Sequence, residues 1–157
     1  MKILLPIDDS DCAQGTLKWA THFLKNINSS LYLLTVLPFA VTEYDKAQAC
    51  DLLDDAETFL TNHGLHVEKA EWVKNESVKG ICNYADKMDI DQIIMGSHGR
   101  QGFAHFLLGS VSEGVFRHAK QPVIVVNNRN EANFKVSHME DVCLMEPQNT
   151  VSGLSIK

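Results

Sequence analysis

Glycines and serines near the middle of the chain have the spacing of an anion-binding loop. The pattern Gly-x-x-Gly-x9-Gly-Ser spans residues 96–110. A strand-type apolar run, residues 91–95, precedes it, and residues 111–118 follow with apolar side chains at helical spacing. A helix N-terminus presents unpaired N–H groups and a positive dipole end, and glycines let the backbone approach an anion closely. The order strand, glycine loop, helix therefore predicts a phosphate site.

Two better-known phosphate motifs are absent from the chain. No Gly-Lys-Ser/Thr of a Walker loop occurs, and there is no Gly-x-Gly-x-x-Gly of a dinucleotide fold. A structural alternative stays open, in which the glycines serve only turns and a helix cap.

The charge around the motif favours a small anion over a polymer. The chain has a formal net charge of −6, which argues against nucleic acid as a general partner. Between Gly96 and Lys120 the only acid is Glu113, set against Arg100, Arg117 and Lys120 itself. The motif is therefore locally positive within an acidic protein.

Length and composition predict one domain without metal or disulfide chemistry. The 157 residues are 45% apolar, enough for one ordinary core, and no apolar run reaches 18 residues. The N-terminus begins with a strand rather than a signal sequence, so we expect a cytoplasmic protein without a membrane span. The four cysteines show no Cys-x-x-Cys pair and are expected to be reduced, and His63 and His66 are read as a solvated turn rather than metal ligands.

Strand and helix patterns alternate along the first 127 residues. A pattern of this kind calls for a parallel sheet with right-handed crossovers. The expected strands are residues 2–7, 31–37, 66–73, 91–95 and 123–126. The expected helices are residues 11–25, 77–88 and 111–118, with a further helix between the connection 39–42 and the turn at residues 63–64.

Asp8 follows the first strand, at the edge where ligands bind in open parallel sheets. Its carboxylate is well placed to accept hydrogen bonds from a ribose. The alternative is a carboxylate that only supports the cap of the next helix, for which Ser10 and Asp11 are the candidates.

The glycine motif, the opening segment Lys2–Ser10 and the closing segment Gln121–Val126 together resemble the ATP-binding branch of the universal stress protein family. The similarity covers residues 1–127. It implies a five-stranded parallel α/β sheet in the order 3-2-1-4-5, with helices on both faces, of the adenine-nucleotide alpha-hydrolase-like type. In that order Asp8 and Gly96 lie at the ends of neighbouring strands whose connections leave in opposite directions.

The resemblance also implies a role for each site residue. Asp8 would hold the ribose, Val36 and Met95 would border the adenine, and His98 and Arg100 would reach the outer phosphates. Mg²⁺ or Mn²⁺ would bind mainly through the phosphates. The expected nucleotide-contacting residues are Pro6, Ile7, Asp8, Val36, Met95, Gly96, His98, Gly99, Arg100, Gly109, Ser110, Val111 and Ser112.

The function implied is an ATP-binding regulatory module of the stress response that acts on an unidentified protein partner. No catalytic residue is expected, because residues 96–110 contain no acid and no group that is clearly placed to position water. Two alternatives stay open: a slow ATPase, and a dimeric adaptor whose loop binds nothing.

The C-terminal part of the chain concerns assembly. Residues 128–157 lie outside the resemblance but carry apolar side chains, so we expect an extension that packs on the domain 1–127 or on a partner subunit. Strand 123–126 is apolar and would form an open sheet edge, which invites pairing. We expect a homodimer through antiparallel pairing of this strand with its copy, reinforced by the extension. The alternative cover is the chain's own extension.

Overall fold

Strands and helices alternate along the chain as the sequence pattern predicts. The structure, a computed structural model, describes residues 1–97, 108–127 and 142–145. Within those ranges, no helix is both long enough and apolar enough to cross a membrane. The elements are β1 (Lys2–Pro6), α1 (Asp11–Phe23), β2 (Ser30–Leu37), α2 (Glu43–Asn62), β3 (His66–Lys74), α3 (Ser77–Lys87), β4 (Gln92–Gly96), α4 (Ser110–His118), β5 (Val123–Val126) and β6 (Val142–Met145).

The first five strands form the parallel sheet that the resemblance implied. Their order is β3-β2-β1-β4-β5, and every neighbouring pair among them is parallel. A sixth strand, β6, extends the sheet by pairing antiparallel with β5. The predicted architecture is therefore confirmed, with one added edge strand.

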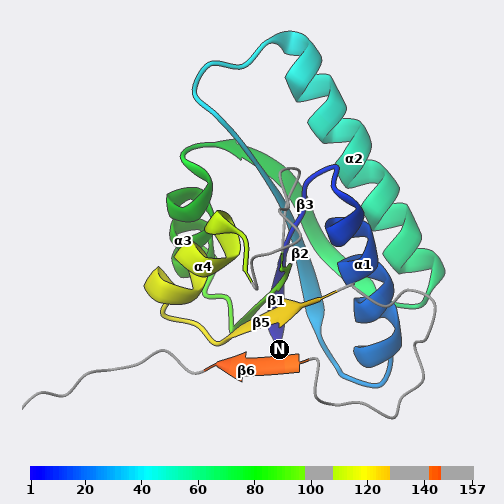
Figure 1. The fold of residues 1–157 in the computed structure, drawn as a ribbon. Coiled ribbons are helices and arrows are strands. Elements are labelled where there is room, and N and C mark those ends of the chain that lie inside the picture. Colours follow the sequence, from blue (N-terminus) through cyan, green and yellow to red (C-terminus); the bar gives the residue numbers. More distant parts are fainter. Residues whose placement is uncertain (98–107, 128–141, 146–157) are drawn as a thin grey trace, which may run out of the picture.

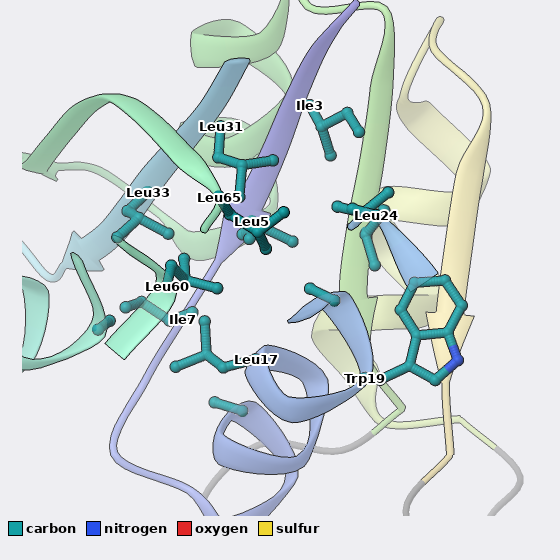
Figure 2. Packing of buried hydrophobic residues seen from close by; sticks show 14 of the residues in the cluster. Ile3, Leu5, Ile7, Leu17, Trp19, Leu24, Leu31, Leu33, Leu60 and Leu65 are labelled. Atoms are coloured by element: carbon teal, nitrogen blue, oxygen red, sulfur yellow. The ribbon is translucent and has the colours of Figure 1, made fainter. Parts of the chain in front are cut away.

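Helices α1 and α2 cover one face of the sheet, and α3 and α4 cover the other (Figure 1). Alternate residues of β1 enter the two cores: Ile3 and Leu5 pack with α1 and α2, whereas Leu4 packs with α3 and α4. All three side chains are fully buried. Figure 2 shows the first of these cores, where Leu5 and Ile7 lie among side chains of α1, α2 and β2.

The helix starts differ in how their backbone N–H groups are satisfied. Ser10 caps α1, since its hydroxyl accepts a hydrogen bond from Ala13 N at 3.2 Å. α2 begins at Glu43, directly after the predicted connection 39–42, and Thr42 and Asp45 form a reciprocal capping box at its start. α3 and α4 begin without a side-chain cap.

The outer edge of β5 is already paired in this chain. Residues 123–126 face residues 145–142 of β6 in a four-residue antiparallel register. Four residues of the extension therefore pair with β5, which was the alternative to a second copy at this edge. The rest of the extension, 128–141 and 146–157, lies outside the described residues. The homodimer through residues 123–126 stays a prediction, and it requires this edge to be vacated.

Candidate functional site

The carboxyl ends of β1 and β4 lie side by side and their connections diverge. The two strands pair directly, with Ile3 opposite Gln92 and Leu4 opposite Ile93. After β1 the chain enters α1 on one face of the sheet, and after β4 it reaches α4 on the opposite face (Figure 1). Such a divergence leaves a crevice at the strand ends, where open α/β sheets bind their ligands.

Asp8 has one carboxylate oxygen committed to the protein. Its Oδ1 accepts hydrogen bonds from Ser10 N at 3.2 Å and from Ser10 Oγ at 2.5 Å. Ser10 in turn caps α1, so the orientation of the Asp8 carboxylate is fixed by the helix start. Within the part of the chain that the structure describes, Oδ2 of Asp8 accepts no hydrogen bond. Both readings of the sequence therefore apply to Asp8: one oxygen supports the cap, and the other can accept from a hydroxyl.

A hub at Ser97 joins the end of β4 to the start of α4. The Ser97 carbonyl accepts hydrogen bonds from Gly109 N at 2.6 Å and from Ser112 Oγ at 2.7 Å. The Ser112 hydroxyl also lies 3.0 Å from the Gly109 carbonyl, and its side chain is 2% exposed. We call these contacts the Ser97–Ser112 clamp. They hold together two residues that are fifteen positions apart.

The N-terminus of α4 has features that favour an anion. Gly109 is its N-cap in extended conformation, and no side chain caps it. The first turn therefore offers backbone N–H groups of residues 110–112 that no capping side chain has taken. Glu113, the one acid in this turn, is bound by Arg117 at 2.8 Å and 3.1 Å. Ser110 is exposed, so its hydroxyl can add a donor beside the N–H groups.

The start of α4 and the start of α1, whose cap Asp8 supports, are linked by packing at Ser97. Ser97 Oγ lies 3.7 Å from Cys12 Sγ, in the first turn of the helix that Ser10 caps. Gly96 permits this approach, since a Cβ there would lie 2.9 Å from Cys12 Sγ and 3.2 Å from Thr16 Oγ1. Packing between α1 and β4 thus requires a glycine at this position whether or not a ligand binds. The sequence motif contains Gly96 and Ser97, but nothing in the spacing pointed to Cys12.

Two of the expected adenine neighbours lie on the same side of the sheet. Met95 is 5% exposed and belongs to the core beneath α3 and α4, and Val36 packs against that core. Val36 is held by α3, since its Cγ1 lies 2.8 Å from where a Cβ of Gly80 would be. The backbone of Val36 at the end of β2, rather than its side chain, is therefore the part that can face a ligand.

Pro6 and Ile7 differ in what they can offer a ligand. Ile7 packs in the opposite core, beside Leu17 and Leu60 (Figure 2). Its backbone N–H donates to the Leu34 carbonyl at 2.9 Å, and its carbonyl accepts from Thr35 Oγ1 at 3.1 Å. Ile7 thus supports the position of Asp8 from within the core. Pro6 is half-buried at the end of β1.

A pocket of about 250 Å³ lies next to the site, between the end of β2 and α2. Its three carboxylates disfavour a phosphate group. It also lies away from the core that holds Met95 and Val36. We therefore place the predicted phosphate contacts elsewhere, at the start of α4. The residues lining the pocket are Asp9, Thr35, Leu37, Asp45, Gln48, Ala49, Asp51 and Leu52.

The remaining predicted contacts have mixed outcomes. Gly109, Ser110, Val111 and Ser112 come together at the α4 start, whereas the predicted residues His98, Gly99 and Arg100 lie outside the described residues. Among the residues that are described, no group of three or more His, Cys, Asp or Glu side chains could hold a metal ion.

Comparison with known proteins gives a consistent result. The model of the universal stress protein family matches residues 1–127. The universal stress protein MJ0531 of Methanocaldococcus jannaschii is 28% identical over 138 residues, covering 80% of this chain and 81% of the relative. MJ0577 of the same organism is 30% identical, and its solved structure superimposes with a TM-score of 0.72, covering 82% of this chain and 96% of that one.

A further solved relative carries a nucleotide. The universal stress protein of Archaeoglobus fulgidus, determined in complex with dAMP, is 25% identical with a TM-score of 0.66, and covers 80% of this chain and 96% of that one. Three observations point to the same family: the order of the parallel strands, the Gly109-Ser110 start of α4 and the family match over residues 1–127. The chain belongs to the universal stress protein family.

Proposed function

We propose that this protein binds an adenine nucleotide, ATP in the first instance, and acts as a nucleotide-dependent regulatory module of the stress response. The observation that carries the proposal is the uncapped N-terminus of α4, tied through Ser97 to the carboxyl end of β4. Ser97 in turn contacts Cys12 in the first turn of α1, the helix whose cap Asp8 supports. The dAMP complex of the Archaeoglobus relative supports an adenine nucleotide as the ligand.

We assign the ribose, the phosphates and the adenine to three different groups of described residues. Asp8 Oδ2 would accept a hydrogen bond from a ribose hydroxyl, since Oδ1 is occupied by Ser10. The N–H groups of residues 110–112 and the Ser110 hydroxyl would bind phosphate oxygens. The backbone of Val36 would border the adenine. Ser112 would contribute its N–H, because its hydroxyl is engaged by the clamp.

The metal ion proposed with the nucleotide, Mg²⁺ or Mn²⁺, would be held chiefly by the phosphates. The described residues provide no cluster of acidic or imidazole side chains for it. This arrangement is ordinary for Mg²⁺, which commonly keeps several waters and binds through substrate phosphates with few protein ligands. His98 and Arg100 are proposed from the motif to neutralise the outer phosphates.

Two measurements test the proposal. Freshly purified protein is denatured and its released small molecules are identified by mass, and calorimetry then measures ATP, ADP, AMP and cyclic AMP with and without Mg²⁺. We expect an adenine nucleotide to bind wild type and to fail with Gly109→Val, whose branched side chain stands where phosphate must approach. Equal affinity of the two proteins, or no binding of any of the four nucleotides, would refute the proposal and favour the adaptor alternative.

A further inference from the structure

The two edges of the sheet are protected in different ways. At one edge, β3 carries the charged residues Glu68, Lys69 and Glu71, and its pairing with β2 is interrupted at Glu68 by a bulge. Charges and bulges are the usual means of keeping an edge strand from pairing with another chain. At the other edge, residues 123–126 of β5 are Val-Ile-Val-Val without a charge or a bulge. This second edge is protected only by a partner strand.

The partner strand is provided by the chain itself. Val125 faces Cys143 and Ile124 faces Leu144, in an antiparallel ladder of four pairs. The two strands have the same length, four residues each. β5 is bounded in sequence by Pro122 and Asn127. The segment 142–145 is likewise bounded in sequence, by Asp141 before it and by Glu146-Pro147 after it. Charged residues and prolines next to a strand confine its pairing to a short stretch.

A sheet edge can accept only one partner strand at a time. The inner side of β5 is paired with β4, so the N–H and C=O groups that face β6 are the row of this strand that another chain could use. A β5 strand from a second copy, running antiparallel about a two-fold axis, would need the same row. Pairing with β6 and pairing with a second copy are therefore mutually exclusive.

From this exclusion we infer that β6 is a built-in competitor for the assembly surface of the protein. While residues 142–145 lie on β5 of their own chain, that edge is closed and the chain is a monomer. When β6 leaves, the four uncharged residues of β5 are exposed, and the occupant that fits them is β5 of a second copy, which is equal in length and also lacks charges. The extension therefore opposes the dimer and does not reinforce it. This inference does not depend on nucleotide binding.

A disulfide trap tests whether the pairing occurs within one chain. The Cα atoms of directly opposed antiparallel residues are about 4.5–5.5 Å apart, and a disulfide accepts about 4.4–6.8 Å. Val125→Cys should therefore bond to the native Cys143 on mild oxidation, in a background in which the exposed Cys50 is serine. The control is the same protein with Cys143→Ser. We expect a bond within a monomer, read by mass and non-reducing electrophoresis; a linked dimer, or no bond, overturns the inference.

Releasing β6 tests the competition. In the full chain, Cys143→Pro with Leu144→Pro removes at least one N–H of the ladder, because neighbouring residues of a strand point their N–H groups to opposite sides. We expect light scattering to show a doubled mass at micromolar concentration, with a cooperative unfolding transition retained. The matched control, Val151→Pro with Ser152→Pro, lies after the strand and should stay monomeric. A variant that folds and remains a monomer overturns the inference, and if it does not fold, the disulfide trap decides alone.

Discussion

Replacing Ser112 by alanine separates two roles that a serine in this motif can have. If its hydroxyl binds phosphate, the change weakens nucleotide binding and leaves the free protein intact. If its hydroxyl closes the Ser97–Ser112 clamp, the change destabilises the free protein. The structure favours the second role, because the hydroxyl donates to the Ser97 carbonyl at 2.7 Å and the side chain is 2% exposed.

The magnitude follows from the contacts that are lost. A typical intramolecular hydrogen bond contributes about 0.5–1.5 kcal/mol net, and the Ser97 carbonyl keeps its bond from Gly109 N, so no buried group is left unpaired. Alanine recovers part of this through helix propensity, which favours it over serine by roughly 0.5 kcal/mol. We therefore expect Ser112→Ala to lower the free energy of unfolding by up to about 1 kcal/mol.

The assay is urea unfolding of nucleotide-free protein, paired with calorimetry of ATP binding. Ser110→Ala is the matched control. Ser110 lies two residues before Ser112 and is exposed, so its hydroxyl should affect only ligand binding. We expect Ser110→Ala to leave stability within about 0.5 kcal/mol of wild type and to weaken ATP binding by about 1 kcal/mol. If instead Ser112→Ala unfolds like wild type and loses as much ATP affinity as Ser110→Ala, the clamp interpretation is wrong.

Four further predictions can be checked on the same protein. Gly96→Ala should lower the free energy of unfolding by about 1–3 kcal/mol, as overpacking does, because its Cβ would lie 2.9 Å from Cys12 Sγ; urea unfolding should show partial recovery when Cys12→Ala is added, and full additivity would contradict the contact. Asp8→Ala should weaken ATP binding by about 1–3 kcal/mol through a lost charged hydrogen bond, and unchanged affinity in calorimetry would remove Asp8 from the site. Hydrogen bonds from Lys120 and Gln121 hold the pKa of Asp86 below its usual value of 3.8, so this contact stabilises the fold above the ordinary carboxyl pKa and is lost as the pH falls through the lowered pKa. Lys120→Ala should therefore raise the pKa of Asp86 in an NMR titration, whereas an unchanged titration would show that Lys120 does not act on it. Hydrolysis of ATP in single-turnover assays should stay below about 1 s⁻¹, the low end of ordinary enzymes; a faster rate would favour the ATPase alternative.

Local patterns were sufficient to predict the strands and helices, but not the order of the strands in the sheet. The strands and helices of residues 1–126 follow from apolar periodicity, because burial on a sheet or a helix face imposes a period on the side chains. The Ser10 cap was among the predicted candidates and is confirmed. α2 begins where the predicted connection 39–42 ends, and Thr42 and Asp45 stand there at capping-box spacing. The parallel strand order rested on the resemblance to the family and is confirmed.

The candidate site depended more on contacts between distant residues. The motif predicted where α4 begins, but it could not show that the Ser112 hydroxyl bonds to Ser97, or that Cys12 packs against Gly96. Those contacts join residues fifteen and eighty-four positions apart, and no period or spacing encodes them. The same holds for the strand β6, since its apolar residues were visible in the sequence while their partner was not. The sequence by itself determined which segments form strands and helices and where a phosphate could bind, because these depend on neighbours along the chain. Only the tertiary structure decided which hydroxyl is left for the ligand and which strand closes the sheet, because each depends on what the folded chain brings alongside.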